Sequence, residues 1–360
     1  MLRQILRVVK LVGLRRALRM KRRHEQGLAP LRGHVATRCF WTLLQCGLWD
    51  ELREAVSVDI DEFAARRGLD RQTLHAICKY LDGIGWVGLQ EASLRAGPTL
   101  QTLLAEPRGL FELGYAYEPV MNALDDLLAG KAAVGRDVRR RTDWVGIGSG
   151  RLCEQLPYPV LGDLVARWGG TRLIDLGCGD GAFLIWMLRR IPGLHATGLD
   201  VDEATADLAR RRIAEEGLTD RADVVRGDMF DLVADSGEAK GLPDLSRIDT
   251  VTACDTFHEY LWDGDGRIVD FLKALRVRRP DVTVVMGDFC VQDEEWLRRH
   301  PTASLEHHLW HDLTRQRLIG EAEWRGIFEK AGMTVVDSRV FDLIGHGYFV
   351  LRSATGSGTR

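Results

Sequence analysis

The chain has 360 residues, 45% of them hydrophobic, and a formal net charge of −3, which suits two domains with buried cores. The nearly balanced charge excludes a general nucleic-acid-binding protein, which needs a strongly basic surface. No apolar run is long enough to span a membrane, and the seven scattered cysteines form no CxxC pair. We therefore expect a soluble, cytoplasmic protein with reduced thiols.

Residues 1–30 form a basic amphipathic segment. From Met1 to Arg23 there are nine lysines or arginines and no acid, and apolar residues recur at helical spacing. A transit peptide or a membrane-surface helix has a similar pattern. We interpret the segment as an arm that packs on the rest of the fold or on a partner subunit.

Residues 31–115 predict two consecutive helices followed by a short hairpin. Asp70 caps the second helix, and the strand-like WVGL closes the segment. This order outlines a winged helix, a fold that often binds DNA. However, only Arg71, His75 and Lys79 could contact phosphates from the second helix. We therefore predict a dimerisation domain with no nucleic-acid partner.

Residues 116–160 predict linking helices, and from residue 161 to the end strand-like runs alternate with helical stretches. The runs are RLIDLG, HATGLD, ADVVRGD, IDTVTACD, DVTVVMGDF, MTVVDSRV and YFVLRS. Such alternation indicates an α/β domain with a mostly parallel sheet covered by helices.

The stretch LIDLGCGDGAFL is the strongest motif of the chain. An apolar run ends in Asp175, and Gly177, Gly179 and Gly181 follow before a helix begins. Glycines at a strand-to-helix turn let the backbone approach a ligand closely. The GxGxG spacing after an acid differs from the GxGxxG of dinucleotide-binding folds, so it disfavours NAD. A carboxylate at this turn suits a cofactor with an amine or sulfonium group.

Two further acids lie where a nucleoside needs them. The strand HATGLD ends at Asp200, which is placed to accept hydrogen bonds from ribose hydroxyls. The next strand leads to Asp228, which could accept from the adenine amino group, with the Met229 thioether beside it to pack on the ring.

These three strand ends together resemble those of the class I S-adenosylmethionine-dependent methyltransferases, over residues 160–352. The resemblance implies a Rossmann-like seven-stranded sheet whose last strand is antiparallel. With the winged-helix outline it extends to small-molecule O-methyltransferases of bacteria and plants. That wider resemblance implies a homodimer with S-adenosylmethionine as cofactor.

The stretch TFHEYLWD follows the fourth strand, where such O-methyltransferases carry an LHDW sequence. His258 and Glu259 match its His-Asp pair, so the resemblance places them at the acceptor. His311 lies in a second histidine-rich stretch, SLEHHLWHDL, that faces the acceptor in those enzymes. Asp288 ends the next strand and is expected in the same region, so these four residues are the catalytic candidates.

The layout is also similar to the 2-oxo acid C-methyltransferases of nonribosomal-peptide precursor pathways, which include phenylpyruvate C3-methyltransferase and 2-ketoarginine methyltransferase. In the phenylpyruvate enzyme two histidines hold a metal that binds the 2-oxo acid. By position, His258 and His311 are the matching pair, for a non-haem iron or zinc ion. For the substrate carboxylate, the run GRDVRRRTDW offers Arg139 and Arg141.

Three functions follow from these patterns. The first is C-methylation beside the ketone of a 2-oxo acid, where a metal stabilises the enolate because the C–H group is a very weak acid. The second is O-methylation with His258 or His311 as general base, which needs no metal because a phenol is a stronger acid. The third is a winged-helix regulator that senses S-adenosylmethionine.

Overall fold

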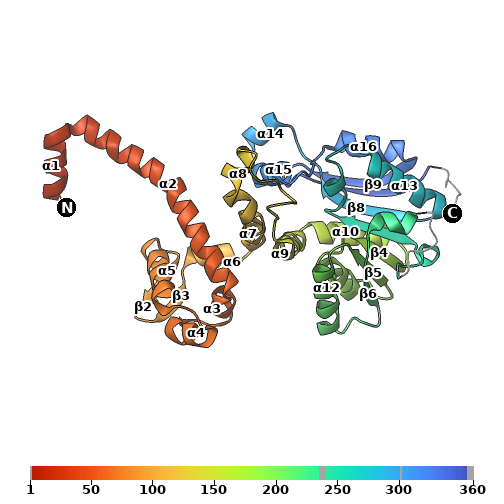
Figure 1. Cartoon of the computed structure of the whole chain (residues 1–360), viewed down its shortest axis with the longest axis horizontal. Helices are drawn as coiled ribbons and strands as arrows, with labels where there is room; N and C mark the ends of the chain where they lie inside the picture. Colours follow the sequence, from red (N-terminus) through yellow and green to blue (C-terminus); the bar gives the residue numbers. More distant parts are fainter. Residues whose placement is uncertain (1, 235–240, 301, 355–360) are drawn as a thin grey trace. The chain divides into compact units, whose positions relative to one another are not determined.

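The computed structural model describes residues 2–234, 241–300 and 302–354, and it divides the chain into two compact units (Figure 1). The first unit comprises residues 1–111 and the second residues 112–360. Among the described residues, no helix is long and apolar enough to cross a membrane.

The first unit is mainly helical. Its elements are α1 (Leu2–Val12), α2 (Leu14–Gln45), α3 (Leu48–Glu54), β1 (Val58–Asp59), α4 (Ile60–Arg67), α5 (Arg71–Gly83), β2 (Val87–Gln90), β3 (Ser93–Ala96) and α6 (Pro98–Leu104). The strands form a small sheet in the order β1-β3-β2. Asp70 caps α5 as predicted, because its side chain accepts a hydrogen bond from the backbone N–H of Thr73. The description of this unit as a winged-helix dimerisation domain stays a prediction.

The basic arm continues directly into the first unit, because α2 runs unbroken from the arm to Gln45. The first side chain of α2 that is buried is Ala36, so the earlier turns contact little of the described chain. In α5, Arg71 and His75 both pair with the carboxylate of Asp61, at 2.5 Å and 2.6 Å. Two of the three candidate phosphate contacts are thus already paired with an acid.

The second unit is an α/β domain. Helix α7 (Arg108–Asn122) leads into it from the first unit, followed by α8 (Leu124–Leu128), α9 (Thr142–Cys153) and α10 (Pro157–Trp168). The remaining elements are β4 (Arg172–Leu176), α11 (Ala182–Arg190), β5 (His195–Asp200), α12 (Glu203–Glu215), β6 (Ala222–Arg226), β7 (Thr250–Cys254), α13 (Gly266–Arg278), β8 (Thr283–Phe289), α14 (Glu294–Arg299), α15 (Ser304–Leu313), α16 (Glu321–Lys330), β9 (Met333–Phe341) and β10 (His346–Ser353).

The predicted seven-stranded α/β sheet is confirmed. Its strand order is β6-β5-β4-β7-β8-β10-β9, and β10 runs antiparallel to both of its neighbours. The chain order reverses beside β4, which pairs with β5 on one side and β7 on the other. In open α/β sheets, ligands bind at the carboxyl ends of the strands next to such a reversal.

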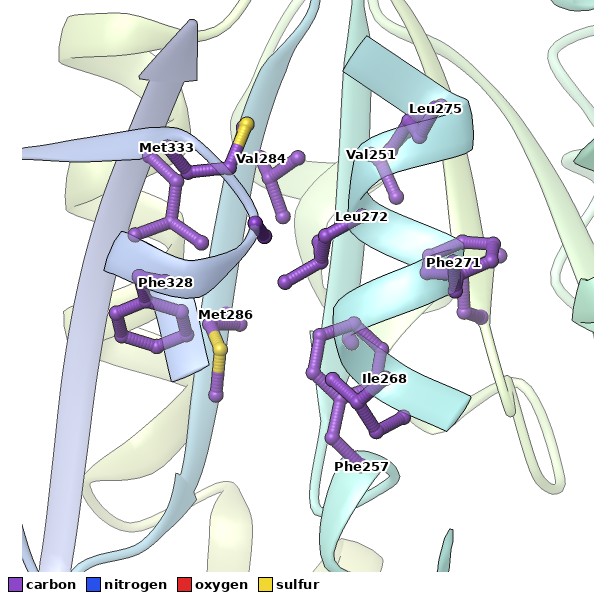
Figure 2. Packing of buried hydrophobic residues seen from close by; sticks show 14 of the residues in the cluster. Val251, Phe257, Ile268, Phe271, Leu272, Leu275, Val284, Met286, Phe328 and Met333 are labelled. Atoms are coloured by element: carbon purple, nitrogen blue, oxygen red, sulfur yellow. The ribbon is translucent and has the colours of Figure 1, made fainter. Parts of the chain in front are cut away.

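Both faces of the sheet are buried, which explains why its strands are continuously apolar. Val284 and Met286 of β8 face α13 and α16, where they pack with Leu272 and Phe328 (Figure 2). Val285 points to the opposite face and packs among residues of α10 and α11. This alternation follows from the two-residue period of a strand, and the two buried layers hold the strand ends in fixed positions.

Candidate active site

A cavity opens at the carboxyl ends of β4, β5 and β7. Five residues predicted to bind the cofactor line it, namely Asp175, Gly177, Gly179, Asp200 and Met229. Gly181 and Asp228 are absent from its described lining. Gly181 is the N-cap of α11, and the carboxylate of Asp228 accepts from the backbone N–H of Phe230 at 3.1 Å, so both shape the chain beside the cavity.

The loop after β4 needs its glycines for conformation and, at one position, for space. Gly177, Gly179 and Gly181 have φ angles of 67°, 55° and 79°, in the left-handed region that favours glycine. A Cβ on Gly177 would lie 2.7 Å from the hydroxyl oxygen of Thr256, whereas a Cβ on Gly179 would meet nothing within 4 Å. Gly177 is therefore the position where the loop passes closest to the rest of the site.

Asp175 and Asp200 lie next to this loop, in β4 and at the end of β5. Asp175 is buried and accepts a hydrogen bond from the Thr252 hydroxyl at 2.7 Å, and burial raises the pKa of its carboxyl to about 7. Asp200 accepts from the backbone N–H of Gly179 at 3.0 Å and from that of Asp202 at 3.0 Å. Burial also raises the pKa of Asp200 because it disfavours the charged carboxylate, and a ligand with a cation or a hydroxyl donor would stabilise the ionised form of both acids.

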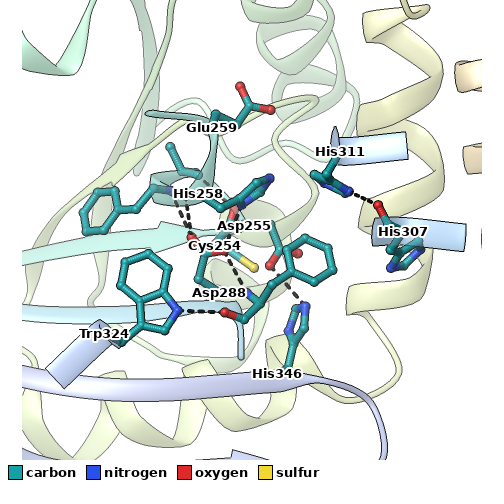
Figure 3. Close-up of polar contacts among 12 residues, drawn as sticks. Cys254, Asp255, His258, Glu259, Asp288, His307, His311, Trp324 and His346 are labelled. Atoms are coloured by element: carbon teal, nitrogen blue, oxygen red, sulfur yellow. Dashed lines mark hydrogen bonds and ion pairs between the residues drawn. The ribbon is translucent and has the colours of Figure 1, made fainter. Parts of the chain in front are cut away.

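His258 is held by Asp288, as Figure 3 shows. The two side chains are 3% and 1% exposed, and the Nδ1 of His258 lies 2.8 Å from Oδ1 of Asp288. The other carboxylate oxygen accepts from the backbone N–H groups of Phe257 and His258. Burial works to lower the pKa of His258, but the charge and hydrogen bond of Asp288 outweigh it and raise that pKa. Since Nδ1 donates to the carboxylate, Nε2 is the atom left for a ligand.

His311 approaches His258 from α15, with ring centroids 5.0 Å apart. Its Nδ1 lies 2.6 Å from the carbonyl oxygen of His307, which can only accept, so Nδ1 carries the proton. Burial lowers the pKa of His311 to about 2 and keeps the ring neutral, with a lone pair on Nε2. The predicted meeting of His258 and His311 is therefore present, with the Nδ1 of each ring occupied.

Glu259 lines the cavity but pairs with Arg140 rather than with His258. Its carboxylate lies 2.5 Å from Nη2 of Arg140 and points away from the His258 ring (Figure 3). Arg140 also donates to the hydroxyl of Tyr117 at 3.0 Å and itself lines the cavity. Arg140 and Glu259 thus form an ion pair at the cavity wall.

Arg139 and Arg141, expected to bind the substrate carboxylate, are not among the described lining residues. Arg139 donates to the carbonyl of Gly135 at 2.9 Å. Arg141 lies over the ring of Tyr115 and pairs with Glu118 at 2.9 Å. Within the run of arginines, only Arg140 reaches the cavity, and consecutive arginines in the sequence carry no signal that distinguishes it.

Sequence reasoning missed Asp255, His346 and Cys153. Asp255 follows β7 directly, so the strand-end rule that selected Asp200 could have found it. Its Oδ1 lies 3.3 Å from Nε2 of His346, and its Oδ2 accepts from the Cys153 thiol at 3.4 Å. His346 begins β10 and reaches this position because it pairs in register with Phe289 of β8, which the local sequence does not reveal.

The pair His258 and His311 fits a metal through the chemistry of its donors. Each ring presents Nε2 while a carboxylate or a carbonyl fixes its Nδ1–H, which is how metal-binding histidines are commonly oriented. Within the described chain, no third histidine, cysteine or acid completes a group with them. A metal held there would therefore take its remaining ligands from water or substrate.

Residues 173–281 match the methyltransferase domain family. Over 325 residues the chain is 28% identical to 2-ketoarginine methyltransferase from Streptomyces arginensis, covering 88% of this chain and 90% of the relative. It is 26% identical over 172 residues to the mitomycin biosynthesis 6-O-methyltransferase from Streptomyces lavendulae, covering 46% of this chain and 43% of the relative.

Solved structures show the same fold. The mitomycin 7-O-methyltransferase structure has a TM-score of 0.64 and 19% identity, covering 94% of this chain and 99% of the other. Human N-acetylserotonin methyltransferase in complex with SAM has a TM-score of 0.67 and 14% identity, covering 92% and 98%.

Proposed function

Because the chain is a class I S-adenosylmethionine-dependent methyltransferase, we propose that it methylates the carbon beside the ketone of a small 2-oxo acid. The observation that carries this proposal is the pair His258 and His311, whose Nδ1 atoms are both engaged while both Nε2 atoms are free for a ligand. The relative named for 2-ketoarginine, which aligns with most of the chain, supports the same substrate class.

S-Adenosylmethionine binds in the cavity in this proposal. Asp200 accepts the ribose hydroxyls, and Met229 packs beside the adenine, as the strand ends of the motif suggest. Gly177 and Gly179 leave room for the backbone to approach the methionine part of the cofactor. Asp175 lines the cavity, and its ionised carboxylate would favour the cationic cofactor over a neutral one.

An iron or zinc ion bound to His258 and His311 would supply the Lewis acidity that stabilises an enolate. The chain itself positions the reactants. Asp288 fixes the His258 ring, and the His307 carbonyl fixes the His311 ring, so little reorganisation is needed when a ligand arrives.

Arg140 is the cation proposed to bind the substrate carboxylate. It lines the cavity, and its guanidinium is already oriented by Tyr117 and Glu259. A planar guanidinium binds a carboxylate through two parallel hydrogen bonds. When the substrate takes these donors, Glu259 is released beside the substrate and can accept the proton removed from its carbon.

O-methylation is the second candidate, and the pair His258 and Asp288 favours it. A histidine with a raised pKa, buried against a carboxylate, suits the role of general base for a hydroxyl group. His311 does not suit that role, because burial lowers its pKa to about 2. If the reaction is O-methylation, we therefore expect His258 alone to be essential as base.

We also propose that the protein is a homodimer. Helices α1 and α2 expose leucines that nothing in their own unit covers, and Leu11 is 84% exposed. A row of large exposed apolar residues is typical of an interaction surface. Light scattering after size-exclusion chromatography tests this, and a monomer at micromolar concentration would contradict it.

The decisive experiment combines metal analysis with product mapping. The protein is incubated with methyl-labelled cofactor and a panel of 2-oxo acids and phenols, and NMR locates the label on carbon or oxygen. His258→Ala and His311→Ala should both lose bound metal and C-methylation. His308→Ala, on the same helix as His311, is the matched control and should keep both.

Two results would overturn the proposal. If neither histidine substitution lowers the bound iron or zinc, the metal site is wrong. If the label enters only phenol oxygens and only His258→Ala is inactive, the O-methyltransferase candidate is correct.

A further inference from the structure

Two thiols and a carboxylate meet on the wall of the cofactor cavity. Cys153 ends α9, Cys254 ends β7, and Asp255 follows it. One sulfur from each cysteine and one oxygen of Asp255 all lie within 4.8 Å of one another. Within the described residues, no other group of three histidines, cysteines or acids is this close, and all three members line the cavity.

The polar atoms of this cluster are incompletely paired by the protein. Oδ1 of Asp255 is buried and makes no hydrogen bond, although Nε2 of His346 lies 3.3 Å away (Figure 3). Asp255 also adopts a φ of 53°, which is uncommon for a residue with a side chain and marks a strained position. A buried carboxylate oxygen without a hydrogen bond is costly unless a cation compensates it.

The donor set selects a particular kind of cation. Thiolate sulfur together with a carboxylate oxygen suits Zn²⁺ or Cd²⁺, with zinc–sulfur distances of about 2.3 Å and zinc–oxygen distances of about 2.0–2.2 Å. The ligand atoms of such an ion lie closer to one another than the upper limit seen here, so small side-chain rotations suffice. Nε2 of His346 lies 3.3 Å from Oδ1 of Asp255, where it would orient the carboxylate.

We propose that Cys153, Cys254 and Asp255 form a binding site for a thiophilic divalent cation, and that the occupied site excludes the methyl donor. Each thiol gives its proton to solvent as its sulfur bonds to the ion. The site is distinct from the pair His258 and His311 and shares no ligand with it. It also does not depend on which acceptor the enzyme methylates.

Exclusion follows from space. The cluster lines the same cavity as Asp175, Gly177 and Asp200, which the cofactor occupies in our proposal. The two thiol protons leave as the ion binds, so the net charge of the cluster is unchanged and the exclusion depends on the space that the ion occupies. The ion and its fourth ligand fill part of the cavity that the cofactor occupies in our proposal. Zinc would therefore inhibit the enzyme by competing with its cofactor.

The test is a cadmium titration of the reduced full-length protein, followed through the ultraviolet charge-transfer absorption of cadmium–thiolate bonds. We expect one equivalent per chain to produce this absorption in the wild type. Cys153→Ser and Cys254→Ser should each reduce it, and Asp255→Asn should weaken binding. Cys39→Ser, in the first unit, and His311→Ala are the controls that should keep it.

A second measurement needs no variant. Saturating S-adenosylhomocysteine should prevent the absorption, and cadmium should weaken S-adenosylhomocysteine binding, measured calorimetrically, by about tenfold or more. The proposal is overturned if the absorption persists undiminished in both serine variants, or if saturating cadmium leaves the binding of S-adenosylhomocysteine unchanged. Neither result depends on the acceptor, so neither bears on the proposed 2-oxo acid activity.

Discussion

Replacing Asp288 with asparagine removes the group that orients His258. The carboxylate accepts from the His258 ring at 2.8 Å and from three backbone N–H groups at 2.8 Å, 3.0 Å and 3.2 Å, and it is 1% exposed. Asparagine keeps one acceptor oxygen. Whichever way its amide turns, its NH₂ group faces a position where the native protein has an N–H donor.

The cost of Asp288→Asn follows from these contacts. A hydrogen bond to a charged group contributes about 1.5–3 kcal/mol, and a buried donor left without a partner costs about 1–3 kcal/mol. The free energy of unfolding should therefore fall by about 3–5 kcal/mol. For a unit of this size, that corresponds to a decrease in melting temperature of roughly 10 °C.

The same change should alter the chemistry of His258. If the new amide donates to Nδ1, the ring proton moves to Nε2, and the lone pair proposed to bind the metal is lost. Loss of a partner that orients a ligand typically lowers metal affinity about 10–100-fold. Calorimetric unfolding and titration with Zn²⁺ or Fe²⁺ measure the two effects separately.

The matched control for this substitution is Asp249→Asn. The oxygens of Asp249 also accept backbone N–H groups, from Thr171 and Arg172, but at the opposite end of the sheet. Asp249→Asn should lower stability while metal affinity and methyl transfer stay unchanged. Wild-type metal affinity in folded Asp288→Asn protein would refute the role assigned to Asp288.

Two further predictions concern the glycine loop and the buried histidines. Gly177→Ala should weaken S-adenosylhomocysteine binding in calorimetry more than Gly179→Ala, because only Gly177 lacks space for a Cβ; equal losses would contradict this. The pKa of His311 is lowered to about 2 and that of His307 to about 4, so the unfolded chain binds more protons below pH 6.5. In urea unfolding, the contribution of His311 should lower the free energy of unfolding by about 2 kcal/mol when the pH falls from 7 to 5. His258 acts oppositely, because its pKa is raised in the folded protein. Its contribution to stability is complete below about pH 6.5 and is lost as the pH rises through its folded pKa. A free energy of unfolding that is the same at pH 5 and pH 7 would refute the predicted loss of stability in acid.

The sequence by itself determined the sheet and the cofactor loop. Continuous apolar runs, each followed by a helical stretch, are formed by neighbouring residues in the chain, so the strands were predictable from local sequence. Asp175 and Gly177 were identified for the same reason, because a strand, an acid and three spaced glycines are close together in the chain. His258 and His311 were found through the resemblance, and the structure brings their rings within 5.0 Å.

Only the tertiary structure decided which polar side chains share the cavity. Arg140, rather than Arg139 or Arg141, reaches it, because consecutive residues of an irregular segment point in different directions and burial selects among them. His346 approaches Asp255 only because β10 pairs antiparallel with β8, a contact between segments far apart in the sequence. Local patterns set the backbone, whereas the partners of each charged group depend on packing that no short stretch of sequence encodes.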